Sequence, residues 1–237
     1  PTGTHLATAS SDGTCIIWNP HTGEKTTTLT GHTSTVTGVA WHPTDNLIAT
    51  TSSDHTCIIW NPHTGEKTTT LTGHTEAVTG VAWNPDGTRL ATVSWDGTGI
   101  VWDSRTGHPI TTLAGHTFWV TEAAWNPDGT HLATTSNDRT CIIWNPHTGK
   151  RTITLTDHTN TVTGAAWHPD GDLIATTDAS GLIRISHLDG TLERAFISVR
   201  PRVPGVESYA SWTPEGLDVL EGEAWRVLRV PEPEDGS

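Results

Sequence analysis

A unit of 42 residues is repeated along most of the chain, and this repetition limits the possible folds more than any other feature. The copies share a leading dipeptide, found at Gly31-His32, Gly73-His74, Gly115-His116 and, with the glycine lost, Asp157-His158. They also share a tryptophan, found at Trp18, Trp60, Trp102 and Trp144. A repeat of this length cannot bury an apolar face alone, so neighbouring copies must pack on one another.

Short alternating runs separated by turn residues predict four β-strands in each copy. In the first complete copy the expected strands are residues 35–41, 47–51, 56–61 and 67–71. Turns such as Asn84-Pro85-Asp86-Gly87 combine proline with a glycine that tolerates a left-handed backbone. Because no stretch shows a helical period, the sequence predicts an all-β protein.

A period of about 40–45 residues, with Gly-His at its head and Trp near its end, is typical of WD40 repeats. On these residues the chain resembles the WD40 family over residues 1–198. The literal Trp-Asp pair is kept only at Trp102-Asp103, and asparagine follows the tryptophan in the other copies. The resemblance implies a β-propeller of four-stranded blades, either a short ring of about five blades or a partial propeller.

The repeat boundaries predict the organisation of the chain. Residues 1–30 are expected to form a partial blade of three strands, and residues 31–198 to form four repeats. The last repeat is degenerate, because Ser180 and Ser186 stand where the aspartate and the tryptophan belong. Residues 199–230 are expected to close or cap the propeller, with 206–212 pairing beside Leu6–Ser10. Residues 231–237 are acidic and proline-rich, which favours a disordered tail.

The composition of the chain indicates which partners and which cellular compartment to expect. The formal net charge of −13 disfavours binding to a phosphate backbone, so nucleic acid is not an expected partner. No apolar run is long enough to cross a membrane. Cys15, Cys57 and Cys141 occupy one repeat position and read as small buried hydrophobes, because equivalent atoms of separate blades lie too far apart for a disulfide. A reducing cytoplasm is the expected compartment.

One recurrent set of side chains has the residue types of an acid–base–nucleophile site. In the WD40 family the corresponding histidine, hydroxyl, aspartate and tryptophan form a buried structural tetrad, and the resemblance implies the same role here. Thr50 and Ser52 share a strand face, and Thr50 is the favoured hydroxyl because threonine recurs at its position. The predicted tetrads are His32, Thr50, Asp54 and Trp60; His74, Thr92, Asp96 and Trp102; and His116, Thr134, Asp138 and Trp144.

The sequence gives weaker support to the other candidate sites. Five turn histidines share one rim and invite a metal or pH-sensing interpretation: His21, His42, His63, His147 and His168. Copies in different blades diverge, whereas a metal needs its ligands within about 2.0–2.3 Å of one point, so solvated turn residues are the better interpretation. No phosphate-binding loop or nucleophile elbow is present, and the sequence predicts neither a catalytic residue nor a cofactor.

Departures between near-identical copies are the most informative positions. Trp95 replaces serine or asparagine before a tetrad aspartate, Phe118-Trp119 replaces small or polar residues, and Glu122 replaces a glycine. In the family the loops that carry these aromatic residues lie on the top face, where partners bind. The predicted partner-binding positions are therefore Trp95, Phe118, Trp119 and Glu122. The three rings have the composition of a binding hot spot, and the alternative is that they only pack on each other between blades.

The resulting functional hypothesis is a non-catalytic scaffold that binds a protein or peptide on its top face or senses a ligand. The repeats resemble near-identical arrays at the C-terminal end of bacterial signalling proteins, including NTPases of the STAND class. That resemblance implies a sensor module attached to an effector domain in a longer chain. The alternative is a purely structural propeller, designed or recently amplified, without a specific ligand.

Overall fold

The computed structural model describes residues 3–199, 208–213 and 216–221, and these residues form β-strands and turns in five antiparallel sheets. This agrees with the predicted all-β class. The first sheet has three strands, β1 (Leu6–Ala9), β2 (Thr14–Trp18) and β3 (Lys25–Thr30). The second has four, β4 (Val36–Trp41), β5 (Ile48–Ser52), β6 (Thr56–Trp60) and β7 (Lys67–Thr72).

The third and fourth sheets repeat the second. The third sheet comprises β8 (Val78–Trp83), β9 (Arg89–Ser94), β10 (Thr98–Asp103) and β11 (Pro109–Ala114). The fourth comprises β12 (Val120–Trp125), β13 (Leu132–Ser136), β14 (Cys141–Trp144) and β15 (Arg151–Leu155). The fifth begins with β16 (Val162–Trp167), β17 (Leu173–Asp178), β18 (Leu182–His187) and β19 (Leu192–Val199).

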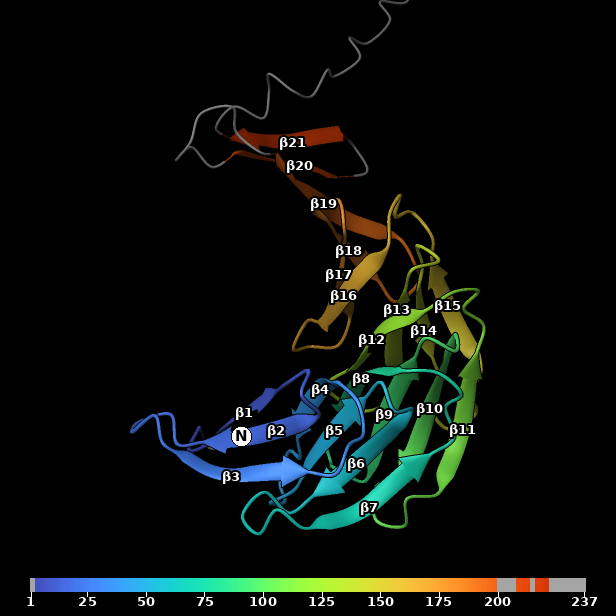
Figure 1. Cartoon of the computed structure of the whole chain (residues 1–237). Helices are drawn as coiled ribbons and strands as arrows, with labels where there is room; N and C mark the ends of the chain where they lie inside the picture. Colours follow the sequence, from blue (N-terminus) through green and yellow to red (C-terminus); the bar gives the residue numbers. More distant parts are fainter. Residues whose placement is uncertain (1–2, 200–207, 214–215, 222–237) are drawn as a thin grey trace, which may run out of the picture.

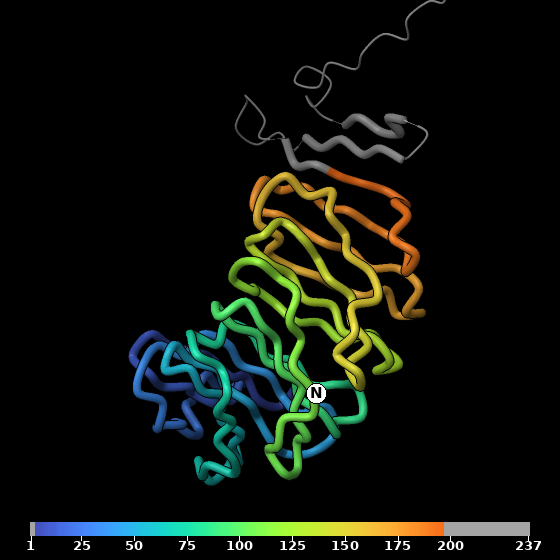
Figure 2. Tube along the Cα trace, turned by 90° about the vertical axis from the view of Figure 1, so that its right-hand side faces the viewer, coloured from blue at the N-terminus to red at the C-terminus, as the bar shows by residue number. Residues whose placement is uncertain are grey.

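The sheets follow one another along an open arc. Figure 1 shows the first sheet at one end of this arc and the fifth at the other, and Figure 2 shows the same succession from blue to orange. The inner strands β4, β8, β12 and β16 contact each other in chain order, and β1 contacts β4. Among the described residues no comparable contact joins the fifth sheet to the first, so these residues form a partial propeller.

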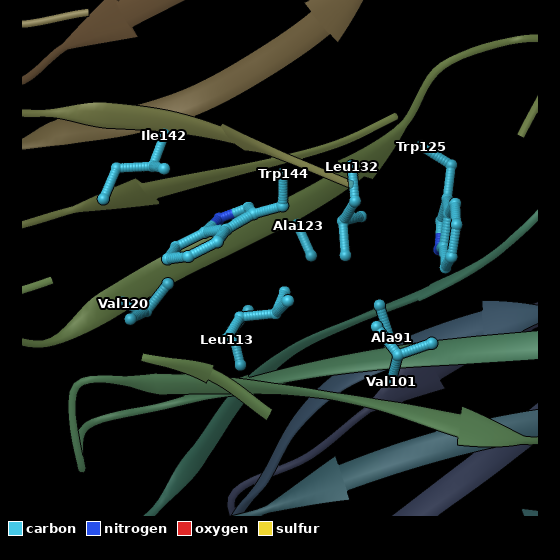
Figure 3. Close-up of a cluster of buried hydrophobic side chains, with 10 residues drawn as sticks. Ala91, Val101, Leu113, Val120, Ala123, Trp125, Leu132, Ile142 and Trp144 are labelled. Atoms are coloured by element: carbon cyan, nitrogen blue, oxygen red, sulfur yellow. The ribbon is translucent and has the colours of Figure 1, made fainter. Parts of the chain in front are cut away.

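The hydrophobic core lies between adjacent sheets. Figure 3 shows one layer of it, where Val101 and Leu113 of the third sheet face Leu132 and Trp144 of the fourth. Trp144 is about as buried as the aliphatic residues around it, with 1% of its surface exposed. Because each layer needs side chains from two copies of the repeat, no copy can fold alone.

A β-bulge in each inner strand links neighbouring sheets. The strand register skips Thr79 in β8 and Thr121 in β12, and these unpaired residues turn toward the next sheet. The Thr79 hydroxyl donates a hydrogen bond to the carbonyl of Val120 at 2.7 Å, and Thr121 does the same to Val162 at 2.7 Å.

A second hydrogen bond at each junction runs the opposite way. The indole N–H of Trp125 donates to the carbonyl of Ala82 in the preceding sheet at 3.0 Å, and Trp167 donates to Ala124 at 2.9 Å. These tryptophans therefore serve as donors between sheets as well as core residues.

The C-terminal strands differ from the prediction. β20 (Ser208–Thr213) pairs with β19, and β21 (Gly216–Glu221) pairs with β20, so the fifth sheet has six strands. The expectation that 206–212 pairs beside Leu6–Ser10 was therefore wrong. The physical reason is proximity, because an antiparallel strand reaches its sequence neighbour through a short connection and avoids the entropy of closing a long loop. The tail at 231–237 lies outside the described residues.

Candidate functional site

The predicted tetrad residues come together in one hydrogen-bonded chain in the second sheet. Trp60 Nε1 donates to Thr50 Oγ1 at 2.7 Å, and Thr50 Oγ1 lies 2.8 Å from His32 Nε2. His32 Nδ1 lies 2.8 Å from the carboxylate of Asp54. A neutral imidazole with its proton on Nδ1 satisfies every partner, because the threonine hydroxyl then donates to Nε2 and the ring donates to the aspartate.

The third and fourth sheets repeat this geometry closely. The histidine lies 2.8 Å from both the threonine and the aspartate in each, and the tryptophan donates to the threonine at 2.8 Å. Burial lowers the pKa of His74 and of His116, although their aspartate partners oppose that shift, which favours the neutral imidazole. The residues are His74, Thr92, Asp96 and Trp102, and His116, Thr134, Asp138 and Trp144.

The aspartate of each tetrad also orders two loops. Asp54 accepts the backbone N–H of Thr33 at 2.9 Å and both the N–H and the hydroxyl of Thr56, at 3.0 and 2.6 Å. Burial alone would raise the pKa of this carboxyl, but the hydrogen bonds from Thr56, Thr33 and His32 outweigh burial and lower the pKa to about 2. The ionised carboxylate therefore joins the loop before the inner strand to the turn after the second strand.

Access to the tetrad is closed. Thr50 is fully buried, and the side chains of His32 and Asp54 are only 2% and 10% exposed. A nucleophile must reach its substrate, whereas this hydroxyl is already held by the indole and imidazole groups. The arrangement can stabilise two loops and a core tryptophan, and it offers no surface on which a substrate could react.

The fifth sheet keeps most of a tetrad that sequence reasoning had treated as lost. His158 lies 2.8 Å from Thr176 Oγ1 and 3.0 Å from Asp178 Oδ2. Asp178 sits two positions before Ser180, the residue that replaces the usual aspartate, and Ser180 donates its N–H to Asp178. The aspartate has moved along the turn, and an acidic residue two positions away was the signal that could have revealed it. Only the tryptophan is missing, replaced by Ser186.

The aromatic residues that interrupt the repeat form one exposed group. The rings of Trp95 and Trp119 stack with centroids 4.7 Å apart at 20°, and Phe118 lies 5.1 Å from Trp119 at 39°. Their exposed fractions are 45%, 41% and 50% respectively. We call these three residues the aromatic cluster, and the side of the molecule with the tetrad turns the top face. A core layer would bury such rings, so mutual packing accounts for only part of their surface.

The backbone beneath the aromatic cluster is held by hydrogen bonds within two successive sheets. Trp95 N–H donates to the carbonyl of Ala77 at 3.0 Å, and Asn137 N–H donates to the carbonyl of Trp119 at 2.9 Å. Trp95 directly precedes Asp96 of one tetrad, and Phe118-Trp119 follow His116 of the next. The cluster therefore stands across the junction of the third and fourth sheets on two loops that the tetrads order.

Glu122 is engaged elsewhere. Its carboxylate accepts the backbone N–H of Ala165 in the fifth sheet at 3.1 Å. Gly164 leaves room for this contact, since a Cβ there would lie 3.2 Å from the carboxylate oxygen. Partial burial raises the pKa of Glu122, although the Ala165 N–H opposes the shift. The structure brings Trp95, Phe118 and Trp119 together. It places the carboxylate of Glu122, which was predicted to bind a partner with them, at the junction between the inner strands β12 and β16.

The position of Glu122 predicts a pH-dependent effect on stability. Because the pKa is raised in the folded state, ionisation of this group costs stability as the pH rises from the unfolded pKa through the folded one. Glu122→Gln keeps an oxygen acceptor for Ala165 and removes the charge. We expect the variant to melt at a higher temperature than the wild type at pH 7 and at an equal temperature near pH 4. A difference that does not change with pH would contradict this explanation.

The turn histidines have separate environments. His42 is not a solvated turn residue as predicted, because it is buried and its Nε2 lies 3.0 Å from the carbonyl of Gly87. His63 lies beside His5 with ring centroids 5.4 Å apart, and His147 contacts the guanidinium of Arg89. Within the described ranges no three histidine, cysteine or acidic side chains converge in a metal-binding arrangement. The three cysteines are free and buried, and burial raises the pKa of each thiol.

The fold and the site define a class of repeat protein built from consecutive antiparallel sheets. In its three four-stranded sheets a histidine, a threonine, an aspartate and a tryptophan join the sheet to its loops. Comparison with family models places the chain in a specific family. The model described as WD domain, G-beta repeat matches residues 1–19, 23–61, 65–103, 107–145 and 149–185, and the chain therefore belongs to the WD40 family. Its sheets are propeller blades. Comparison with curated proteins yields no match.

WD40 repeats generally mediate protein interactions as scaffolds and are typically not catalytic. In the part of the chain that the structure describes, no helix has the length and hydropathy needed to span a bilayer.

Proposed function

We propose that this chain is a non-catalytic interaction scaffold that binds a protein or peptide partner through the aromatic cluster on its top face. One observation carries the proposal: three exposed aromatic residues stand together where every other copy of the repeat has small or polar residues. Exposed aromatic residues reduce solubility, and tryptophan is the residue type most enriched in interface hot spots. Their loops are held by tetrads, so the binding surface is ordered before a partner arrives.

The wider role in this proposal is that of a sensor module in a larger bacterial signalling or defence protein, where the propeller would hold an effector domain inactive. The near-identical repeats support this part, through their resemblance to arrays in such proteins. The net charge of −13 supports a protein partner over nucleic acid, and three buried free thiols fit a reducing cytoplasm. The competing function is a structural array without a ligand, and the same experiment separates the two.

The test is a selection of displayed random peptides on the wild-type protein and on a matched variant. The variant Trp95→Ser/Phe118→Ser/Trp119→Thr takes its residues from equivalent positions of another copy, Ser53, Ser34 and Thr35. Because the fold already accommodates those residues, its melting temperature should change little. We expect peptides to be enriched on the wild type and lost on the variant. A single Trp95→Ala change should weaken binding of an enriched peptide by about 2 kcal/mol, roughly 30-fold in Kd.

Two outcomes would contradict the proposal. Equal enrichment on the wild type and the variant would move the binding surface away from the aromatic cluster. No enrichment on either protein would favour the structural array. The control Ile110→Thr removes an exposed apolar side chain on β11, at the position that Thr68 occupies in the preceding copy. It should bind peptides as the wild type does.

A further inference from the structure

We infer that the aromatic cluster recognises a proline-rich segment in the extended polyproline II conformation. This inference rests on the proposed function and adds the chemistry of the partner to it. It comes from three properties of the cluster: its free hydrogen-bond donors, the arrangement of its rings and the charges beside it.

The indole groups of the cluster differ in their hydrogen bonding from the tryptophans at the repeated positions, with the exception of Trp41 in β4. Tryptophans of the tetrads donate to threonine, and those of the inner strands β8, β12 and β16 donate to backbone carbonyls. Trp95 and Trp119 have no acceptor for their indole N–H among the described residues. The cluster therefore presents two donors within an apolar surface, and its partner should supply acceptors on an apolar body.

A proline-rich segment has this complementary chemistry. Each residue contributes a carbonyl acceptor, and proline has no backbone N–H that would need an acceptor on the cluster. The polyproline II helix exposes its backbone and is already extended before binding, so little conformational entropy is lost. Aromatic-lined surfaces are the usual docking sites for such segments.

The ring arrangement suits flat pyrrolidine rings. Trp95 and Trp119 are stacked at 20°, while Phe118 is inclined at 39° to Trp119. The stack uses one face of each indole, and close to half of the surface of each residue stays exposed. The two loops that hold the rings are fixed by the Ala77 and Trp119 carbonyl hydrogen bonds, so the ring edges and the remaining faces form a surface that does not need to reorganise.

The charges beside the aromatic cluster do not favour a charged partner. Glu76 precedes Ala77, the backbone partner of Trp95, and it is exposed. Arg139 follows Asn137, the backbone partner of Trp119, by two residues, and it is also exposed. Groups of both charge signs therefore lie close to the cluster in the chain, so an Arg- or Lys-rich segment gains attraction from the carboxylates and repulsion from the guanidinium. An uncharged proline-rich segment avoids that repulsion.

The experiment measures fluorescence anisotropy of a labelled decaproline peptide titrated with the full chain. Matched peptides of alternating Gly-Ser and of alternating Lys-Gly carry the same label. We expect the wild type and Ile110→Thr to bind decaproline, and Trp95→Ser or Trp119→Thr to weaken that binding at least tenfold. Trp95→Phe and Trp119→Phe keep a ring and remove the indole N–H, so each should weaken binding by a smaller factor of about 3–10. Melting temperatures recorded alongside should agree within a few degrees for all variants.

Several results would overturn the inference. Decaproline could fail to bind, or it could bind no better than the Gly-Ser peptide. Tighter binding of the Lys-Gly peptide that weakens with salt would assign the surface to cationic segments instead. Phenylalanine variants with unchanged affinity would remove the hydrogen-bonding argument on which the inference depends. If peptides without proline are enriched on the wild type in the selection above, this inference fails while the proposed function stands.

Discussion

Trp102→Ala is expected to lower the free energy of unfolding by about 3–5 kcal/mol, the usual cost of truncating a core tryptophan. The side chain is only 2% exposed, and it packs in the layer between the second and third blades with Leu71 and Ile100. Its indole N–H donates to Thr92, so the change also leaves a buried hydroxyl with one partner fewer. Urea unfolding followed by circular dichroism measures the difference.

The matched control is Trp95→Ala, which removes the same side chain from the surface. Trp95 is 45% exposed, and Trp119 is the one ring it stacks on among the described residues. We expect this variant to lose about 1 kcal/mol or less, because little apolar area becomes exposed. If the two variants lost the same stability, Trp95 would be a packing residue, and its role in partner binding would no longer be supported.

Asp54→Ala is expected to destabilise the protein by about 1–3 kcal/mol at pH 7, because the change leaves the His32 ring and the Thr33 N–H without their charged acceptor. The folded pKa of Asp54, about 2, lies below the ordinary value of 3.8 for an aspartate because of the hydrogen bonds from Thr56, Thr33 and His32. A carboxyl with a lowered pKa contributes stability that is fully present above the unfolded pKa and is lost as the pH falls through the folded pKa. The difference between wild type and variant should therefore shrink between pH 4 and pH 2.

Asp12 provides the control for the tetrad. It occupies the same position in the first blade, where its carboxylate accepts hydrogen bonds from the neighbouring Thr14 and has no histidine partner among the described residues. Asp12→Ala should leave the melting temperature nearly unchanged. A tetrad variant with wild-type stability at pH 7 would show that these residues do not hold the blade together, and an equal loss at pH 2 and pH 7 would show that the charge of Asp54 is not what matters.

The strands of each blade could be predicted from local sequence patterns, because alternating residues and turn sequences determine strands and turns over a few neighbouring positions. The strand Thr56–Trp60 and the turn that follows it can be recognised in any single copy. The tetrad partners were also predictable, because their spacing recurs and Thr50 matches a threonine in each copy. The repetition of the sequence was informative in two ways. It identified the positions that every copy shares, and it showed that Trp95 and Phe118-Trp119 differ from the residues at equivalent positions.

Other features depended on groups that are distant in sequence. The bulged threonine hydroxyls reach carbonyls 41 residues away, and the inner-strand tryptophans reach carbonyls 43 residues away. Asp178 could replace the usual aspartate because the turn brings it within 3.0 Å of His158, although its position in the repeat is different. His42 is buried because the next blade covers it, and no local pattern records that contact.

The sequence alone therefore determined the repeat, the strand order within the four-stranded blades and the residues of the three complete tetrads, since strand and turn formation depends on near neighbours. The tertiary structure decided that β20 extends the fifth blade, that Glu122 reaches Ala165, and that Trp95 and Trp119 stack across a blade junction. Each of these contacts depends on how separate blades are placed relative to one another. That placement is set by the balance between side-chain packing and loop entropy over the whole chain. The strand and turn preferences of individual residues do not determine that balance, so these contacts could not be predicted from them.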